Sequence, residues 1–445
     1  MPEIPSTSSR WLDERFRSRF GGGDALAEPG HCLKRWQAAK LAETLQWAAE
    51  RSPWYKRLFR DLPVKELCRA LKTGADPEEV LPALPFTTAD DLAADSDSFL
   101  AVSHSEIDGV VTVPTSGTSG AAKRIRATAD DQQETVEFFE YGMRFLVEPG
   151  QARVALAMSP ARPGNVADLL GRALSKWGIP FMAFGFAPED QASFAEWAGA
   201  VSGWRPSCLV GVPAQMLRLT RFSPLALTEL ETILLSGDVA GPELVSFLER
   251  AFKAKVFRHY GATETGLGGA VECRERVWPH LRDDLLVETI DSLGNPLCGS
   301  EAAGEIVVTT LTRRAMPLLR YRSGDEGALL AAPCACGSVL PRLRTFGRLA
   351  DRFTLPDGRR LRLADFEAPL LKFPYIAGFD LNLREEPFTF KLILYTGGDI
   401  PADAETKIRE AVISALGQLK LEIEPAHVRS LPANGGKRRL IRSNS

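Results

Sequence analysis

The stretch that decides how this chain is interpreted reads Thr115-Ser116-Gly117-Thr118-Ser119-Gly120-Ala121-Ala122-Lys123. It follows a short apolar run at residues 110–113 that is typical of a β-strand. Glycines let backbone N–H groups approach an anion, hydroxyl groups donate to phosphate oxygens, and the lysine adds charge. The loop is not a GTPase P-loop, because Arg124 follows where that motif needs serine or threonine. Alone, it indicates either phosphate binding or, like many polar glycine loops, only a turn.

The composition is that of an ordinary globular protein. Of the 445 residues, 44% are hydrophobic and 25% are charged, and this length favours at least two domains. A net charge of −3 argues against nucleic acid or an anionic membrane as a partner. No apolar run reaches the length of a membrane span, and the polar N-terminal segment does not resemble a signal peptide. The seven cysteines are therefore expected to be reduced thiols in a cytoplasmic protein.

Apolar runs alternate with amphipathic stretches from about residue 110 to residue 340, which is typical of an α/β domain. The apolar runs predict four buried strands, at 154–158, 208–212, 232–235 and 256–260. Nearer the N-terminus, residues 36–60 have the apolar stripe of a helix, which Pro53 should break.

The pattern changes near residue 285. Residues 285–290 and 305–310 alternate apolar and polar side chains, which indicates an added antiparallel β region. From Gly347 onward a small α+β unit is expected, with a strand at 388–395, a helix at 402–416 and a strand at 421–424. We therefore predict a large N-terminal α/β domain over 1–346 and a small C-terminal domain over 347–445.

Four further motifs lie downstream of the phosphate loop. They read His259-Tyr260-Gly261-Ala262-Thr263-Glu264, Tyr321-Arg322-Ser323-Gly324-Asp325, Gly347-Arg348-Leu349-Ala350-Asp351 and Gly435-Gly436-Lys437. The first follows an apolar run, and a strand end that presents a hydroxyl and a carboxylate is a usual ligand position in an open α/β sheet. An aspartate such as Asp325 can accept hydrogen bonds from two adjacent ribose hydroxyls. Each motif alone is also consistent with a turn or a surface ion pair.

In this order and at these separations, the motifs resemble those of the adenylate-forming superfamily of acyl-CoA synthetases, most closely the phenylacetate–CoA ligase family. The resemblance extends over about residues 40–440. It includes three further stretches: Ser52-Pro53-Trp54-Tyr55-Lys56-Arg57-Leu58-Phe59, Leu84-Pro85-Phe86-Thr87-Thr88-Ala89-Asp90-Asp91-Leu92 and Thr309-Thr310-Leu311-Thr312-Arg313-Arg314-Ala315-Met316-Pro317-Leu318-Leu319-Arg320-Tyr321-Arg322. It implies an enzyme that uses ATP and Mg²⁺ to join a carboxylic acid to AMP, with a mobile C-terminal domain that rotates about a hinge near 347–352.

The resemblance also implies roles for the residues around the phosphates. The loop would hold the departing phosphates through Thr115, Ser116, Gly117, Thr118, Ser119, Gly120 and Lys123. Thr263 would contact the α-phosphate, and Glu264 would hold Mg²⁺, a hard cation suited to a carboxylate. Lys437, flanked by glycines, would neutralise charge in the transition state, although it could also be a solvated lysine of the tail.

The nucleoside contacts implied by the resemblance come from other motifs. Tyr260 would pack near the adenine, within a nucleotide-binding segment that includes Gly261 and Ala262. Ser236, Gly237 and Asp238 stand where the family places further adenine contacts. Asp325 would bind the ribose, and Arg348 would reach the ribose or the phosphate from the hinge.

Cys273, His280, Cys334 and Cys336 form a candidate zinc site. Three sulfurs and one imidazole are the ligands of a closed tetrahedral site, which would be structural because it leaves no open position. The two pairs are too far apart in sequence to be diagnostic, so buried inert cysteines are the alternative. Matching cysteines and histidine in some members of the family favour zinc.

For the acyl substrate, the candidate pocket residues are Phe138, Tyr141, Val212, Ala214 and Gly261. Aromatic walls with a small floor favour an aryl carboxylate over a long fatty chain. The aromatic pair could instead belong to the core, and His259 could either approach a ligand or pack as a core side chain.

The chain departs from the family pattern at the hinge, where Ala350 replaces an aspartate. The next segment reads Leu355-Pro356-Asp357-Gly358-Arg359-Arg360, a hairpin-like turn, where the family has an apolar stretch leading to a glycine. These differences bear on the second half-reaction. The acceptor is expected to be coenzyme A, with a carrier-protein thiol or an amine as alternatives. A non-catalytic nucleotide-binding relative is the other alternative, and either a monomer or a homodimer is compatible with the sequence. The lack of Gly-x-Gly-x-x-Gly after a strand disfavours a dinucleotide-dependent oxidoreductase.

Overall fold

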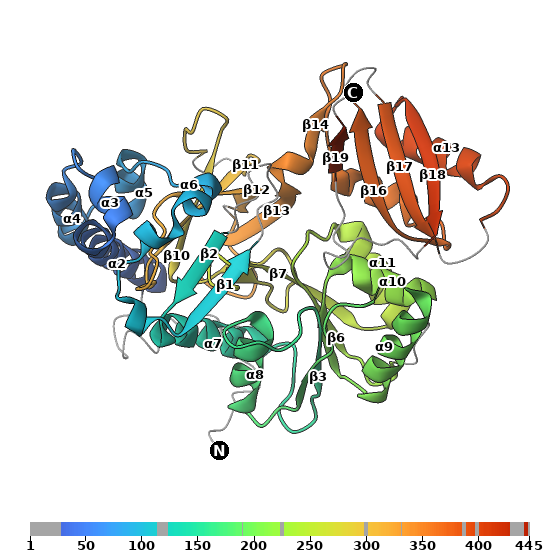
Figure 1. The fold of residues 1–445 in the computed structure, drawn as a ribbon, viewed down its shortest axis with the longest axis horizontal. Helices are drawn as coiled ribbons and strands as arrows, with labels where there is room; N and C mark the ends of the chain where they lie inside the picture. The colour runs from blue at the N-terminus through green and yellow to red at the C-terminus, as the bar shows by residue number, and fades with distance from the viewer. Residues whose placement is uncertain are drawn as a thin grey trace. The chain divides into compact units, whose positions relative to one another are not determined.

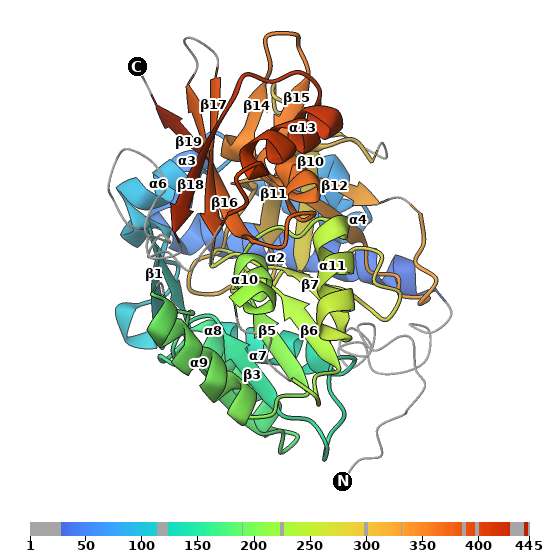
Figure 2. The same ribbon diagram turned by 90° about the vertical axis from the view of Figure 1, so that its right-hand side faces the viewer.

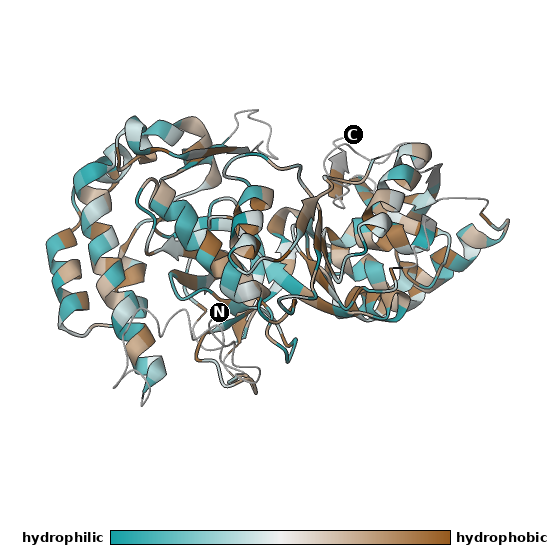
Figure 3. Ribbon diagram, turned by 90° about the horizontal axis from the view of Figure 1, so that it is seen from below, coloured by the Kyte–Doolittle hydropathy of each residue, from teal (hydrophilic) through white to brown (hydrophobic). Residues whose placement is uncertain are grey.

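The computed structural model describes residues 28–113, 123–188, 190–222, 227–297, 301–330, 332–384, 389–396, 400–427 and 440–443. The chain divides into two compact units, which are described separately below (Figure 1). The first unit comprises Met1–Phe145, Arg162–Lys176 and His259–Thr345, and the second comprises Leu146–Ala161, Trp177–Arg258 and Phe346–Ser445. Among the described residues, no helix is long and apolar enough to cross a membrane, and the helices in Figure 3 carry polar and apolar residues in turn.

The first unit begins with a group of helices, coloured blue in Figure 1. These are α2 (Pro29–Arg51), α3 (Pro53–Leu58), α4 (Val64–Thr73), α5 (Pro77–Val80) and α6 (Ala89–Ala94), with 3-10 turns η2 (Leu81–Ala83), η3 (Ser96–Phe99) and η4 (His104–Glu106). As predicted, the first helix is interrupted at Pro53, where the Ser52 side chain accepts a hydrogen bond from the Tyr55 N–H and starts α3. The helices enclose an apolar cluster that includes Leu45, Tyr55 and Tyr321.

Strands β1 (Gly109–Val113) and β2 (Lys123–Ala127) form an antiparallel pair in which Val113 is opposite Lys123. Residues 114–122, which include most of the predicted phosphate-binding stretch, stand between these strands in the sequence and lie outside the described residues. Helix α7 (Ala129–Met143) follows and packs against α8 (Val166–Ser175). The buried Asp131 carboxylate, in the first turn of α7, accepts hydrogen bonds from the N–H groups of Arg314 (2.7 Å) and Ala315 (3.0 Å). This carboxylate fixes the 309–322 stretch to α7.

The antiparallel region of the first unit agrees with the predicted alternation. Its strands are β8 (Ala270–Val271), β9 (His280–Leu281), β10 (Leu285–Ile290), β11 (Gly304–Thr310), β12 (Tyr321–Leu330) and β13 (Arg342–Arg348). They follow the order β10-β11-β12-β13-β9-β8, and β8 is antiparallel to His259 and Tyr260 of the same unit. Two predicted segments, 285–290 and 305–310, are the paired strands β10 and β11.

The predicted strands of the second unit lie in a parallel sheet, but the last of them, 255–260, is buried only at Val256 and Phe257, and its residues His259 and Tyr260 belong to the first unit. The strands of this sheet are β3 (Val154–Ala157), β4 (Phe181–Ala183), β5 (Cys208–Gly211), β6 (Thr232–Leu235) and β7 (Lys255–Tyr260), in the order β7-β6-β5-β3-β4. Every residue of β3, β5 and β6 is buried, which explains their continuous apolar sequences. The helices of this part are α9 (Gln191–Gly203), α10 (Pro213–Phe222) and α11 (Pro242–Phe252).

The C-terminal part of the second unit is α+β, as predicted, with a core of its own that includes Phe353, Phe366 and Phe390. Its sheet has the order β18-β17-β16-β19, and β16, β17 and β18 lie side by side in Figure 2. The bounds are β14 (Arg352–Thr354), β15 (Arg360–Arg362), β16 (Ile376–Arg384), β17 (Thr389–Thr396), β18 (Leu421–His427), β19 (Leu440–Ser443), α12 (Glu367–Leu370), α13 (Ala404–Leu416), η5 (Leu349–Asp351) and η6 (Leu363–Phe366). The hairpin expected near Gly358 is formed by β14 and β15. The division into separate domains at residue 347 stays a prediction.

Candidate functional site

The 259–269 segment forms a tight turn that presents Glu264. Strand β7 ends at Tyr260, the chain reverses, and the Gly269 N–H returns to the Tyr260 carbonyl at 2.9 Å. Within the turn, the Leu267 N–H donates to the Ala262 carbonyl at 2.8 Å. A Cβ atom on Gly261 would overlap the carbonyl oxygen of Leu267, so this close reversal requires glycine at position 261.

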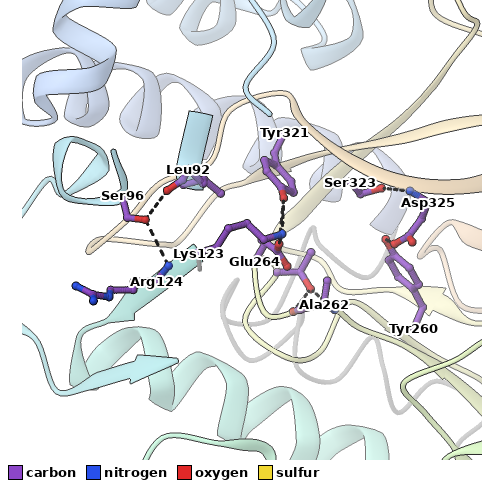
Figure 4. Close-up of polar contacts among 11 residues, drawn as sticks. Leu92, Ser96, Lys123, Arg124, Tyr260, Ala262, Glu264, Tyr321, Ser323 and Asp325 are labelled. Carbon is purple, nitrogen blue, oxygen red and sulfur yellow. Dashed lines mark hydrogen bonds and ion pairs between the residues drawn. The ribbon is translucent and has the colours of Figure 1, made fainter. Parts of the chain in front are cut away.

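Among the described residues, Glu264 has two side-chain partners, which come from separate parts of the first unit (Figure 4). The ammonium group of Lys123, the first residue of β2, forms an ion pair with Oε1. The hydroxyl group of Tyr321, the first residue of β12, donates to the same oxygen at 3.0 Å. The side chains of Glu264 and Lys123 are 9% and 12% exposed. Burial alone raises the pKa of Glu264, but Lys123 and Tyr321 outweigh it and hold the pKa below its ordinary value. The carboxylate is therefore ionised at neutral pH.

A second polar contact joins Tyr260 to Asp325 (Figure 4). The Tyr260 hydroxyl donates to Asp325 Oδ2 at 3.0 Å. The Asp325 N–H in turn donates to Ser323 Oγ at 3.1 Å, and that hydroxyl donates to the Ile306 carbonyl at 2.7 Å. The motif at 259–264 and the motif at 321–325 thus contact each other through the side chains of Tyr260 and Asp325.

This arrangement of the first unit offers the groups that a metal–nucleotide complex needs. A partly buried, ionised carboxylate at Glu264 suits a hard divalent cation. Lys123 supplies a positive charge on the same oxygen. Asp325 is an acceptor of the kind that pairs with sugar hydroxyls, beside an aromatic ring at Tyr260. Thr263 stands directly before Glu264 in the turn, where its carbonyl accepts from the Gly266 N–H at 3.0 Å.

Sequence reasoning assigned no role to Tyr321, although it quoted the residue in a motif. A regular strand would put residues 321, 323 and 325 on one face, but the register of β12 shifts between its pairs with Val307 and Glu305, and Gly324 has a φ of +71°. The sequence pattern therefore did not signal this role. The sequence also did not predict which side chains hold the turn that carries Glu264. There, Thr135 Oγ1 donates to the Gly266 carbonyl at 2.9 Å and accepts from Arg313 at 3.1 Å. No pattern in the sequence predicts that contact.

The remaining nucleotide-binding candidates lie in the second unit or outside the described residues. Ser236, Gly237 and Asp238 follow the carboxyl end of β6, and the Ser236 N–H donates to the Gly211 carbonyl at 3.0 Å. Arg348 is the last residue of β13 and precedes η5. Residues 115–120 and Lys437 lie outside the described residues.

The acyl-pocket candidates differ in their surroundings. Phe138 is only 2% exposed, and its ring packs at 6.2 Å from Phe139 and at 6.3 Å from His259. A Cβ atom on Gly268 would clash with the same ring. The half-buried Tyr141 lies beneath the Arg144 guanidinium, 4.1 Å from its ring centre.

In the second unit, Val212 is fully buried after β5 and Ala214 lies in the first turn of α10. Contacts of Phe138, Tyr141, Val212 and Ala214 with a substrate stay predictions. His259 packs between aromatic rings, and loss of hydration together with the Arg282 charge lowers its pKa to about 4.

The four predicted zinc ligands come together in the first unit. Their ligand atoms all lie within 4.8 Å of one another, and all four residues are buried. Cys273 Sγ is 3.7 Å from Cys334 Sγ, and Cys336 Sγ is 3.4 Å from His280 Nε2. His280 Nδ1 lies 2.9 Å from the Leu340 carbonyl, which directs Nε2 into the cluster. Three sulfurs and one nitrogen fit tetrahedral zinc.

Comparison with known proteins places the chain in a family. The AMP-binding enzyme family matches residues 60–308, which is more than half of the chain. The phenylacetate-coenzyme A ligase of Thermus thermophilus is 27% identical over 383 residues, covering 80% of each protein. The corresponding ligase of Escherichia coli is 24% identical, covering 78% of this chain and 77% of the relative.

Solved structures show the same fold. A 2-hydroxyisobutyryl-CoA ligase in the postadenylation state has a TM-score of 0.80 at 18% identity, over 99% of this chain and 94% of that one. An anthranilate CoA ligase in complex with anthranoyl-AMP has a TM-score of 0.57 at 16% identity, over 87% of this chain and 78% of that one. The chain, with its paired Lys123 and Glu264 and its Tyr260–Asp325 contact, belongs to the AMP-binding enzyme family and shares the fold of adenylate-forming CoA ligases.

Proposed function

We propose that this protein is an acid–thiol ligase that adenylates a small carboxylic acid with ATP and transfers the acyl group to coenzyme A. The observation that carries the proposal is the pairing of Lys123, Glu264 and Tyr321 beside the Tyr260–Asp325 contact. Its two parts suit the phosphate and ribose ends of one nucleotide. The similarity to phenylacetate–CoA ligases over about four fifths of the chain supports the same reaction class.

In the first half-reaction, a carboxylate oxygen of the acid attacks the α-phosphorus of ATP and pyrophosphate leaves. Negative charge grows on the phosphate oxygens, so the barrier is lowered chiefly by positive groups held in place. When bound at Glu264, Mg²⁺ would neutralise part of this charge. Lys123 forms an ion pair with Glu264, and Thr263 precedes Glu264 on the same turn. Lys437 and the loop residues 115–120 would supply the remaining phosphate contacts.

In the second half-reaction, the thiol sulfur of coenzyme A attacks the acyl carbonyl carbon, the thiol loses its proton and AMP leaves. For the nucleoside we propose contacts from Tyr260, Gly261, Ala262 and Asp325, with further contacts from Ser236, Gly237, Asp238 and Arg348. The resemblance to the family supports these roles. A carrier-protein thiol or an amine could replace coenzyme A as the acceptor, because either would attack the same acyl carbonyl carbon.

We propose an aromatic acid as the substrate class. The similarity to phenylacetate-coenzyme A ligases and the partly exposed Tyr141 support this choice. Phe138 adds little support, because its ring is almost fully used in packing against Phe139, His259 and Gly268. Val212 and Ala214 stay candidates for substrate contact, and the fully buried Val212, like Phe138, adds little support.

A structural zinc ion at Cys273, His280, Cys334 and Cys336 is part of the same proposal. All four side chains are buried, and four ligands within 4.8 Å leave no open position for a substrate. Zinc would therefore stabilise the fold and take no part in the reaction.

A panel of carboxylic acids tests the proposed function. Pyrophosphate release from ATP is measured with each acid, first alone and then with coenzyme A, a carrier protein or an amine. We expect release that depends on an aryl acid, and an acyl-CoA product only when coenzyme A is present. Glu264→Gln serves as the inactive control. Acid-independent release, or none with any acid, would contradict adenylation, whereas release without thioester formation would point to another acceptor.

A further inference from the structure

Tyr321 combines a buried ring with a hydroxyl group directed at a charged residue. The side chain is 2% exposed, and its ring belongs to the apolar cluster formed with the N-terminal helices. The hydroxyl leaves that cluster and donates to Glu264 Oε1 at 3.0 Å (Figure 4). A buried tyrosine hydroxyl needs a hydrogen-bond partner, and among the described residues its partners are Glu264 and Lys123 Nζ, the latter at 3.4 Å.

The backbone at Tyr321 is held by hydrogen bonds to Thr87. Thr87 forms a parallel bridge with Tyr321, in which the Thr87 N–H donates to the Arg320 carbonyl at 3.1 Å and the Arg322 N–H donates to the Thr87 carbonyl at 2.8 Å. Thr87 Oγ1 also donates to the Leu319 carbonyl at 3.0 Å. The Leu84–Leu92 stretch thus fixes the strand that carries Tyr321, which leaves the hydroxyl little freedom to move away from Glu264.

The two partners of Glu264 differ in how they respond to a divalent cation. Lys123 is positively charged, so it competes with a metal ion for Oε1 and is repelled by it. The Tyr321 hydroxyl is neutral, and a carboxylate has lone pairs for a hydrogen bond and a metal ion together. Loss of Lys123 from Glu264 would therefore leave Tyr321 as the group that orients the carboxylate.

We propose that Tyr321 is a positioning residue for the Mg²⁺-binding carboxylate of Glu264, and that its hydroxyl remains on Glu264 when Lys123 is displaced. The inference rests on the proposed function. It assigns to Tyr321 a role in the affinity for metal–nucleotide that a side chain used only for packing would not have. Hydrogen bonds of this kind to a metal ligand commonly change metal affinity tenfold or more.

The test is the affinity for ATP measured twice, once with excess Mg²⁺ and once with a chelator. The ratio of the two dissociation constants gives the coupling between metal and nucleotide on the protein. Tyr321→Phe removes only the hydroxyl, so we expect the ratio to fall about tenfold, while the affinity without metal stays within about twofold. In pyrophosphate exchange, KM for Mg·ATP should rise while kcat at saturation stays within about threefold.

Two matched controls accompany this measurement. Tyr260→Phe also loses a hydroxyl, but one that is bonded to Asp325, so it should weaken ATP binding equally with and without metal. In a Glu264→Gln background, Tyr321→Phe should no longer change the ratio, because the group it orients is absent. The melting temperature of each variant reports whether the core is intact.

The outcomes separate this inference from the proposed function. If the wild-type protein shows no coupling between Mg²⁺ and ATP binding, and if none of the acids supports pyrophosphate exchange, the proposed function is wrong. If the wild-type protein couples metal and nucleotide but Tyr321→Phe does so equally well, Tyr321 is a core aromatic residue and the inference is overturned. An equal effect of Tyr321→Phe in the Glu264→Gln background would also overturn it, because the effect would not pass through Glu264.

Discussion

Two clusters of the first unit are suited to cations, and they are built in opposite ways. One has the oxygen of Glu264 with an internal ammonium group and a hydroxyl, and the other has three sulfurs and an imidazole. Both draw on the segments 259–281 and 321–342 of the antiparallel region. Glu264 has a partner that a metal ion can replace, whereas the three sulfurs and one imidazole would by themselves complete a coordination shell. Glu264 lies on a turn, and of the four zinc-ligand candidates only His280 lies on a strand, β9. The same region would thus carry one exchangeable site, at Glu264, and one permanent site, at the three cysteines and His280, and the ligand atoms would make the difference.

The largest expected effect concerns the permanent site. Cys334→Ser should lower the free energy of unfolding by about 4 kcal/mol or more, because the binding energy of a structural zinc ion is folding energy. Rate constants of the surviving folded protein should change less. Chemical denaturation measures the loss, and Cys32→Ser, a half-buried cysteine outside the cluster, is the control. Elemental analysis of protein purified without added metal should find one zinc per chain. A content near zero, with the four side chains unmodified, would remove the permanent site from the comparison.

The next effect concerns the exchangeable site. Lys437→Ala should slow acyl-adenylate formation by at least about a hundredfold, equivalent to about 2.7 kcal/mol of barrier, with ATP binding nearly unchanged. The reason is that its charge would act in the transition state. Single-turnover formation of acyl-AMP measures the rate, and Lys420→Ala, an exposed lysine of the same C-terminal part, is the control. Near-normal adenylation by the Lys437 variant would exclude this lysine from the site.

A smaller effect is expected beneath the Glu264 turn. Gly266 has a φ of +76°, and a Cβ atom there would fall on the Arg313 guanidinium. Gly266→Ala should therefore cost about 2–3 kcal/mol of stability and weaken Mg·ATP binding, because Glu264 lies on the displaced turn. Gly178→Ala is matched in backbone angle, at +65°, but has open space around it, so it should cost only about 1 kcal/mol. Equal stability losses for the two variants would show that Arg313 gives way freely.

The smallest effect is a pH dependence at His259. The pKa of His259 in the folded protein is about 4, below its ordinary value of 6.5. Between these two pH values the imidazole is protonated in the unfolded chain and neutral in the folded chain. Stability from this group is complete above pH 6.5 and is lost as the pH falls toward 4, by about 2 kcal/mol between pH 7 and pH 5. His259→Asn should lose less stability over this interval than the wild-type protein in paired denaturation curves. Parallel curves would mean that folding leaves the pKa of His259 unchanged.

Much of the architecture followed from local patterns. The buried strands β3, β5 and β6 are fully apolar, the alternation of β10 and β11 is regular, and Pro53 ends a helix for a steric reason. The four zinc-ligand candidates were also found from residue type, and the structure brings them together. For the strands and the helix break, the physical signal lies within a few residues, whereas the zinc-ligand candidates were joined by residue type and by the family resemblance.

What could not be predicted depends on contacts between distant segments. The Asp131 carboxylate holds two backbone N–H groups about 180 residues away, and Thr135 with Arg313 supports the Glu264 turn. Phe138 was a reasonable candidate for a pocket wall, but Gly268 and His259 surround its ring, and neither is signalled by its helix. A single sequence carries no information on such pairs beyond chemical compatibility.

The two-part surroundings of Tyr321 have a consequence for how such a chain would drift if selection for its reaction were relaxed. The ring would still be required by the apolar cluster with Tyr55 and Leu319, so an aromatic residue would persist at this position. Only the hydroxyl would become dispensable. A shift from tyrosine to phenylalanine at position 321 would then be an early and structurally silent mark of a lineage losing its chemistry. Outright replacement by a small residue would instead report a loss of the fold.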